Sequence, residues 1–253
     1  MKTGFCFIVG AGSFDKMSII PSENDYVIAA DGGYKYLMQM GIEPDVLIGD
    51  FDSLELIPEH RNLIRHSPIK DDTDMALAAA YAANEGYRRF IIYGGLGGRL
   101  DHTMANLMLI NSMAGAGMEV YLIGEGIIVS TIFQERVAFS EDFSGTFSAF
   151  CLGEPCSGVT EYGFKYGLND EVLKSGMTLG VSNEFLGHES YVEVKKNILT
   201  VIWDEKNGLP AVRTKIKSLD IENGMSSLVS EMGWRSIQGE QENLMISDRY
   251  SER

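Results

Sequence analysis

Acidic residues and glycines cluster at four points along the chain, and each cluster follows a short segment that could form a strand. The clusters are Asp31-Gly32-Gly33, Gly49-Asp50-Phe51-Asp52-Ser53, Lys70-Asp71-Asp72-Thr73-Asp74 and Gly94–His102. Carboxylate oxygens are ligands that Mg²⁺ prefers, and glycine-rich loops expose backbone N–H groups to anions. The four clusters together therefore indicate a site for a divalent cation and a phosphate compound.

The segment Gly94–His102 carries the strongest of these signals. Glycine occupies four of its first five positions, Gly94, Gly95, Gly97 and Gly98. Ordering such a loop costs conformational entropy, which favours a functional reason for it. A helix that starts after the loop adds N–H groups and a positive dipole end, and Arg99 adds a forked donor for phosphate oxygens. Asp101 is a candidate helix cap, metal ligand or substrate ligand. The segment is not a Walker A loop, because no Gly-Lys-Ser/Thr follows.

Asp50 and Asp52 are the favoured metal ligands. Alternate residues of an extended segment project to the same side, so the two carboxylates can converge on one cation. The other interpretation is a solvated loop in which Ser53 caps a helix. Asp74 opens an alanine-rich helical pattern, where an acidic residue also complements the helix N-terminus. With a second acidic cluster nearby in the fold, a shared site for metal or substrate is favoured.

Asp31 and Lys70 have weaker signals. Asp31 could bind a hydroxyl, a metal-bound water or a helix N-terminus, although an Asp-Gly pair is more often a simple turn. Lys70 either neutralises phosphate charge or is a surface lysine.

The composition excludes several classes of protein. With 253 residues, 45% hydrophobic and 23% charged, the chain is expected to be globular. A net charge of −15 argues against binding nucleic acid or anionic lipid. The apolar runs are too short to span a membrane, and the N-terminus lacks a signal-peptide pattern, so we expect a cytoplasmic protein. The three cysteines, Cys6, Cys151 and Cys156, are predicted to remain thiols and not to bind zinc.

Strand-like and helical patterns alternate in the first half. Strands are expected at Gly4–Val9, Tyr26–Ala30, Val46–Ile48, Phe90–Tyr93 and Glu119–Ile123, and helices at Tyr34–Met40, Leu54–Arg65, Thr73–Glu85 and Asp101–Ala114. This alternation predicts a parallel sheet covered by helices, with ligands at the carboxyl ends of its strands. The many apolar side chains of Asp101–Ala114, including Met104 and Met108, predict a core helix.

After Gly126 the helical periodicity ends and strand patterns dominate. They cover Val129–Phe133, Gly145–Cys151, Val159–Phe164, Met177–Ser182, Ser190–Val194 and Ile198–Trp203, with a hairpin turn expected at Lys196-Asn197. This half is predicted to be antiparallel, a β-sandwich or small barrel. The expected units are an α/β domain at 1–125, a β-sandwich domain at 126–212 and a tail at 213–253, with some helix around Gly224–Met232.

The chain resembles the thiamine pyrophosphokinase family in the type and order of these motifs. The matching stretches are Asp31-Gly32-Gly33, Gly49-Asp50-Phe51-Asp52-Ser53, Asp72-Thr73-Asp74, Gly94–His102, Gly163–Leu168 and Ser182-Asn183. The resemblance spans roughly residues 1–203. It implies a Rossmann-like parallel-sheet domain that binds ATP, followed by an antiparallel β-sandwich domain. It also implies a homodimer with thiamine bound between subunits. The implied reaction converts ATP and thiamine into AMP and thiamine diphosphate with Mg²⁺.

The resemblance also implies a role for each cluster. Asp50, Asp52 and Asp74 would hold Mg²⁺ and orient the thiamine hydroxyl. The Gly94–Gly98 loop, Arg99 and Asp101 would grip ATP, with Asp31 and Lys70 near the nucleotide. Tyr166, Ser182 and Asn183 would face the thiamine rings. Tyr166 stands where the family often has tryptophan, and Gly180-Val181 departs from its Ser-Thr-Ser-Asn run, but an aromatic ring still suits a cationic thiazolium.

Two other functions fit part of the pattern. Asp50-Phe51-Asp52-Ser53 also resembles the start of a haloacid-dehalogenase-type phosphatase, with Asp50 as nucleophile and Asp71-Asp72 as a second metal pair. These aspartates follow the third expected strand and not the first, and such an enzyme would leave the glycine loop without a role. The third candidate is a non-catalytic nucleotide-sensing module, which would bind ATP without producing AMP.

Overall fold

Six short strands from the first half of the chain pair in parallel. The computed structural model describes residues 2–14, 16–51, 60–65 and 72–216. The six strands are β1 (Cys6–Val9), β2 (Tyr26–Ala30), β3 (Val46–Gly49), β4 (Leu63–Arg65), β5 (Arg89–Tyr93) and β6 (Glu119–Gly124). Their spatial order is β4-β3-β2-β1-β5-β6, and every neighbouring pair in this order is parallel. The central strands are apolar and buried along their length, as expected for a sheet covered on both faces.

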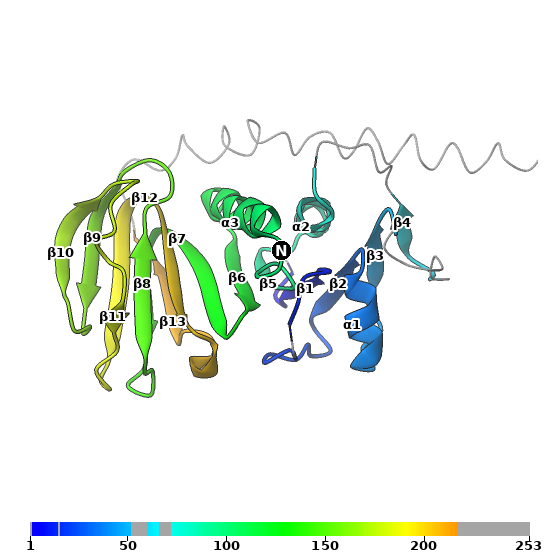
Figure 1. Cartoon of the computed structure of the whole chain (residues 1–253), viewed down its shortest axis with the longest axis horizontal. Coiled ribbons are helices and arrows are strands. Elements are labelled where there is room, and N and C mark those ends of the chain that lie inside the picture. The colour runs from blue at the N-terminus through cyan, green and yellow to red at the C-terminus, as the bar shows by residue number, and fades with distance from the viewer. Residues whose placement is uncertain (1, 15, 52–59, 66–71, 217–253) are drawn as a thin grey trace, which may run out of the picture.

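Three helices cover the parallel strands. They are α1 (Gly33–Gln39), α2 (Asp74–Asn84) and α3 (Leu100–Gly115). The helices α2 and α3 lie over one face of the sheet and α1 over the other (Figure 1). Helix α2 begins where the Thr73 hydroxyl accepts a hydrogen bond from the backbone N–H of Ala76, at 3.2 Å. Its alanines are small enough to bring the helix axis close to the sheet, so the N-terminus of α2 is held at the strand ends.

The strands of the second half pair antiparallel. They are β7 (Ile127–Phe139), β8 (Thr146–Phe150), β9 (Cys156–Tyr162), β10 (Leu168–Leu173), β11 (Asn183–Glu184), β12 (Ser190–Asp204) and β13 (Val212–Lys215), with a 3₁₀ turn η1 (Glu205–Asn207) after β12. The beginning of β7 pairs with β6, and β7 then pairs along its length with β12. The described strands therefore form one continuous hydrogen-bonded sheet that runs from the parallel into the antiparallel part (Figure 1).

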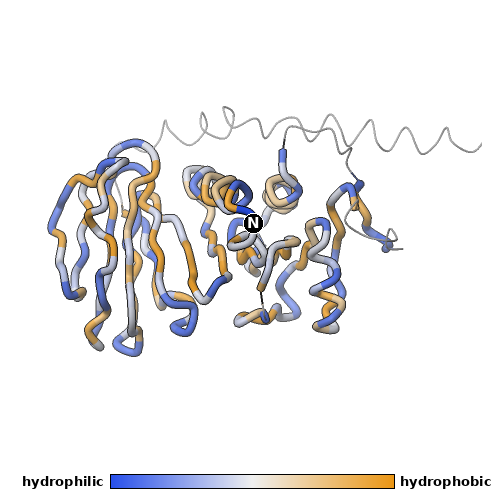
Figure 2. The backbone as a smooth tube through the Cα atoms, in the orientation of Figure 1, coloured by the Kyte–Doolittle hydropathy of each residue, from blue (hydrophilic) through white to orange (hydrophobic). Residues whose placement is uncertain are grey.

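Aromatic side chains fill the interior of the second half. Phe147 stacks on Phe164 with ring centroids 4.3 Å apart, and Phe139 meets Trp203 edge-on at 5.7 Å. The hydrophobic stretches of the backbone follow the strands, whereas the connecting turns are mostly hydrophilic (Figure 2). The fold as a whole is a mixed α/β structure dominated by its sheet.

Two predicted elements of the first half differ from the structure. Leu63–Arg65, the end of an expected helix over Leu54–Arg65, forms strand β4 beside β3, while residues 52–59 lie outside the described part. Pairing of Leu63 and Ile64 with the open edge of β3 outweighs a helical pattern. Helix α3 is also not a core helix on all sides. Met104 and Met108 are 51% and 70% exposed, and Ile110 and Met113 are buried.

The second half also corrects two predictions. No hairpin turn forms at Lys196-Asn197, because β12 continues through it. Three residues of β12 lie between the pairs Val194↔Glu135 and Ile198↔Phe133, against one of β7, so the irregularity is a bulge. Asn197 tolerates the left-handed backbone of this bulge at φ 66°. Met177–Ser182 forms turns and not a strand, and β10 was not predicted.

Several other predictions can be compared with the structure. Cys6, Cys151 and Cys156 are buried free thiols, as predicted. The helix expected around Gly224–Met232 lies outside the described residues. Among the helices that the structure describes, none combines the length and the apolar character that crossing a membrane requires.

Candidate active site

The loops after β1, β2 and β5 meet around a cavity of about 460 Å³. Strand β1 lies between β2 and β5, because the chain moves outward from β1 to β4 and then returns to the other side of β1. Ligands of open α/β sheets bind at such switch points. The cavity is lined by Gly10, Ala11, Gly12, Ser13, Ala30, Asp31, Thr73, Asp74, Met75, Gly94, Gly95, Gly97, Gly98, Arg99, His102 and Asn106. Three of the four sequence clusters thus contribute to one site.

Two glycine loops form the floor of this cavity by direct backbone contact. The N–H of Gly12 donates to the carbonyl oxygen of Gly94 at 3.0 Å, and the N–H of Gly10 donates to that of Tyr93 at 2.8 Å. Gly94 has a φ of 69°, and a Cβ at this position would overlap the Gly10 carbonyl. Only glycine fits at position 94, so the close contact of the two loops depends on it.

Asn106 of α3 fixes the same loop from behind. It is buried, and its side-chain amide donates to the carbonyl oxygen of Gly95 at 2.8 Å. Sequence reasoning missed this residue. A polar side chain among the apolar positions of an expected core helix is the signal that could have revealed it.

Asp31 supplies a buried acceptor oxygen at the cavity. Its backbone has a φ of 48°, and its N–H donates to the carbonyl oxygen of Ile48 at 2.8 Å. Its Oδ1 is buried and accepts no hydrogen bond from the part of the chain that the structure describes. Because buried carboxylate oxygens are normally paired, this oxygen is suited to a cation or to a donor on a ligand.

Arg99 and Asp101 form an ion pair at the rim of the cavity. Arg99 Nε and Nη2 lie 3.1 and 2.5 Å from the two Asp101 oxygens. The hydrogen bonds from Arg99 lower the pKa of Asp101 to about 2. Both side chains are mostly exposed, at 72% and 64%, so the pair contributes little to stability. Arg99 can therefore exchange this partner for a phosphate at small cost.

The structure leaves the predicted metal site untested. Asp31 and Asp74 line the cavity, but Asp50 is not among its lining residues, and Asp52 and Lys70 lie outside the described part. Gly49 brings its segment against Asp31, since a Cβ on Gly49 would lie 3.0 Å from the Asp31 Cα. No three His, Cys, Asp or Glu side chains of the described residues are grouped closely enough to hold a metal ion. The convergence of Asp50, Asp52 and Asp74 remains a prediction.

The residues predicted to face thiamine lie in the antiparallel part of the sheet and do not line this cavity. They do lie together, because Asn183 bonds both backbone polar groups of Tyr166, at 2.9 Å from its N–H and 2.7 Å from its carbonyl oxygen. The Tyr166 side chain is exposed, whereas Asn183 is buried. Ser182 has a φ of 58°, and its N–H donates to Ser148 Oγ. Asn183 is thus occupied by protein contacts.

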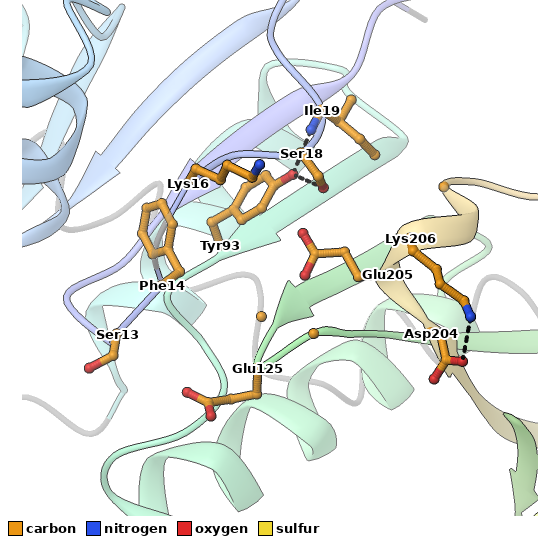
Figure 3. Close-up of a pocket in the computed structure, with 13 residues that line it drawn as sticks. Ser13, Phe14, Lys16, Ser18, Ile19, Tyr93, Glu125, Asp204, Glu205 and Lys206 are labelled. Carbon is orange, nitrogen blue, oxygen red and sulfur yellow. Dashed lines mark hydrogen bonds and ion pairs between the residues drawn. The ribbon is translucent and has the colours of Figure 1, made fainter. Parts of the chain in front are cut away.

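A second cavity, of about 910 Å³, adjoins the first through Ser13 (Figure 3). Its walls come from the loop after β1, the turn between β6 and β7, and the end of β12 with η1. The Tyr93 hydroxyl holds the loop by accepting from the N–H of Ile19 at 3.0 Å and bonding Ser18 Oγ at 3.1 Å (Figure 3). Three carboxylates, those of Glu125, Asp204 and Glu205, and two ammonium groups, those of Lys16 and Lys206, line this cavity. It shares Ser13 with the first cavity but contains none of the four sequence clusters.

Comparison with known families accounts for both halves of the chain. A family model described as "Thiamin pyrophosphokinase, catalytic domain" matches residues 19–122. A second, "Thiamin pyrophosphokinase, vitamin B1 binding domain", matches residues 134–199. The chain belongs to the thiamine pyrophosphokinase family. Members of this family are enzymes that transfer a pyrophosphoryl group from ATP to thiamine, so the cavity at β1 and β5 belongs to an enzyme of this class.

Individual thiamine pyrophosphokinases support the assignment. The chain is 29% identical over 188 residues to "Thiamine pyrophosphokinase" of Bacillus subtilis (strain 168), covering 71% of this chain and 87% of that protein. It is 21% identical to "Thiamin pyrophosphokinase 1" of Caenorhabditis elegans, covering 69% and 77%. A crystal structure of the Bacillus subtilis thiamine pyrophosphokinase superposes with a TM-score of 0.72 at 25% identity, covering 79% of this chain and 98% of that one.

Proposed function

We propose that the chain converts ATP and thiamine into AMP and thiamine diphosphate, with Mg²⁺, at the cavity formed by the loops after β1, β2 and β5. The observation that carries the proposal is the cavity itself. One space is bordered by two mutually contacting glycine loops, the N-terminal turn of α2, the rim residue Arg99 and Asp31, whose buried Oδ1 has no hydrogen-bond partner among the described residues. Phosphoryl-type transfer requires positioning and charge neutralisation, and these groups supply both.

The residues of the cavity fit a divalent cation. Mg²⁺ takes oxygen ligands and usually needs only one or two protein carboxylates besides substrate phosphates. The buried Oδ1 of Asp31 is an acceptor of this kind. We propose that Asp50, Asp52 and Asp74 hold Mg²⁺ beside Asp31. When bound, Mg²⁺ would neutralise charge on the phosphate chain of ATP.

The remaining steps are assigned to residues of this chain. The N–H groups of the Gly94–Gly98 loop bind the phosphate oxygens, and Arg99 leaves Asp101 to bind the transferred group. Lys70 adds positive charge on the nucleotide side. Asp74 also orients the thiamine hydroxyl towards the phosphate chain, since it lies in the first turn of α2 on the cavity wall. The hydroxyl oxygen attacks the β-phosphorus, and the α-phosphate leaves as AMP.

We further propose a homodimer in which the second subunit contributes the thiamine contacts. Tyr166, Ser182 and Asn183 do not line the cavity formed by the loops after β1 and β5. In such a dimer, Tyr166 of one copy would face a thiamine bound at the cavity of the other, and Asn183 would act by holding the Tyr166 backbone. The proposed units are a Rossmann-like domain at 1–125, a β-sandwich domain at 126–212 and a tail at 213–253. The proposed location is the cytoplasm.

The test is incubation of the purified chain with ATP, Mg²⁺ and thiamine. The expected result is formation of AMP and thiamine diphosphate in equal amounts, without inorganic phosphate. Release of inorganic phosphate from a phosphate ester in a separate reaction that contains no ATP would instead indicate a phosphatase. Tight ATP binding without AMP would indicate a nucleotide-sensing module.

A further inference from the structure

Glu161 of β9 is a buried carboxylic acid with no role in the proposed chemistry. Its residue is only 2% exposed, and its Oε2 accepts a hydrogen bond of 2.6 Å from the side-chain amide of Asn183. Its Oε1 is buried and has no hydrogen-bond partner in the part of the chain that the structure describes. Burying a carboxyl group that is only half satisfied is costly. The hydrogen bond with Asn183 is therefore the contact through which Glu161 can act.

The Asn183 amide uses all four of its hydrogen-bonding positions. Its Oδ1 accepts from the N–H groups of Tyr166 and Glu184, both at 2.9 Å. Its Nδ2 donates to the Tyr166 carbonyl oxygen at 2.7 Å and to Glu161 at 2.6 Å. An amide offers two donors and two acceptor lone pairs, so the set is complete and its orientation is fixed. Glu161 supplies the fourth partner, without which Asn183 would keep a buried, unpaired N–H.

The other end of this network is the exposed ring of Tyr166. Asn183 holds Tyr166 by both backbone polar groups, while the side chain is 61% exposed. The flanking contacts tie the same two segments together, because Lys165 bonds Glu184 through its backbone N–H and its side chain. Glu161 is thus connected through Asn183 to the backbone that carries the exposed ring, and Lys165 Nζ lies 5.5 Å from the centroid of that ring.

We propose that Glu161 is a positioning residue for thiamine, which locks the Asn183 amide and thereby fixes Tyr166 to meet the thiazolium cation. The inference rests on the proposed function, because it takes Tyr166 as a thiamine contact. A ring attracts a cation only when its face is presented within about 6 Å of the charge. Loosening the Tyr166 backbone therefore weakens binding of thiamine without disturbing the ATP cavity.

The charge of Glu161 changes near neutral pH. Burial raises the pKa of Glu161 to about 7, and the hydrogen bond from Asn183 opposes this rise. The neighbouring ionisable groups that are paired have partners elsewhere, in the pairs Lys165–Glu184, Lys195–Asp170 and Arg136–Glu193. The other ionisable side chains on β9, β10 and β12 are Cys156, Tyr162, Glu171, Tyr191, Lys196 and Asp204. An ionised carboxylate is the stronger acceptor for the Asn183 N–H. The hydrogen bond between Glu161 and Asn183 is therefore stronger above pH 7 than below it.

The test compares steady-state kinetics of the full chain and two variants at pH 6 and pH 8, with ATP, Mg²⁺ and thiamine. Glu161→Leu removes the acceptor and is expected to raise the KM for thiamine about tenfold, as for one lost hydrogen bond, with kcat and the KM for ATP unchanged. Glu161→Gln keeps a neutral acceptor of the same shape. It is expected to stay within about threefold of the wild type and to lose the dependence of this KM on pH. Glu193→Gln, which alters a buried carboxyl bonded to Arg136 on the neighbouring strand, is the matched control.

The outcomes separate this inference from the proposed function. A wild-type chain that forms no thiamine diphosphate rejects the function itself. With an active wild type, an unchanged KM for thiamine in Glu161→Leu overturns the inference, as does an equal rise in the KM for ATP. If Glu161→Leu does not fold, Glu161→Gln decides alone: a pH dependence that persists in it overturns the positioning role.

Discussion

The cavity at the parallel strands and the Tyr166 segment are held in place by different means. The cavity is built from backbone, because glycine loops touch each other directly and expose their own polar groups. The Tyr166 segment depends on side chains, because one amide and one buried carboxyl group position it. Backbone contacts tolerate almost no substitution, whereas a side-chain network can be changed in steps. Under the proposed function, we therefore expect substitutions at the glycine loops to cost more activity than substitutions in the network around Tyr166.

The largest effect is expected from Asp52→Asn. Removing a charged metal ligand should abolish turnover, lowering kcat at least about a thousandfold, because charge neutralisation is central to this chemistry. The melting temperature should stay close to that of the wild type. Formation of thiamine diphosphate from ATP, Mg²⁺ and thiamine measures kcat, and thermal unfolding measures the melting temperature. Full activity would reject the metal assignment.

Gly94→Ala should come next, because a Cβ would overlap the Gly10 carbonyl. We expect the KM for ATP to rise about a hundredfold as the two loops separate. Gly41→Ala is the matched control. Gly41 has nearly the same φ, 70°, but nothing lies within 4 Å of its would-be Cβ. It should cost only about 1 kcal/mol of stability and leave the KM for ATP unchanged. An equal rise in the KM for ATP in the two variants would contradict a role for the contact between the two glycine loops in binding ATP.

Arg99→Lys should have a smaller effect. Lysine keeps the charge but loses the forked geometry, so we expect about a tenfold loss in kcat/KM for ATP with unchanged stability. Because the ion pair with Asp101 is exposed, breaking it should not affect folding. A loss of stability comparable to the loss of activity would mean that Arg99 is structural.

The smallest effect concerns stability and pH. Between pH 4.5, the ordinary pKa of this carboxyl, and pH 7, the folded chain keeps the Glu161 proton and the unfolded chain releases it. The unfolding free energy should therefore fall as pH rises through this window, by about 1–3 kcal/mol. Glu161→Gln should lack this contribution. Urea unfolding at pH 5 and pH 8 measures this change in unfolding free energy. An equal change in the wild type and in Glu161→Gln would contradict the prediction.

Prediction from sequence succeeded where a short pattern determines the structure. The apolar runs predicted β2 with the bounds that it has and α2 within a residue at each end, because burial and the Thr73 cap are local signals. The glycine loop at Gly94–Gly98 was recognised because its composition is itself unusual. The cavity that it shares with Asp31 and Asp74 then follows from the parallel sheet.

The failures share a different physical origin. Strand β4 depends on the open edge of β3, and the bulge at Asn197 depends on the register with β7, neither of which is visible in a local window. The roles of Asn106 and Glu161 were missed for the same reason. Each partner lies more than ten residues away, so only the folded chain reveals the contact.

Strand β7 has a consequence for how the two substrates can meet. One ladder of hydrogen bonds passes from β5 through β6 and β7 into β12, so rotating one half against the other would break paired backbone groups. Enzymes that close around substrates usually bend at a few unpaired connecting residues. Along the described ladder no such joint occurs between β5 and β12, so we expect the two parts of the sheet to keep their relative position when substrates bind.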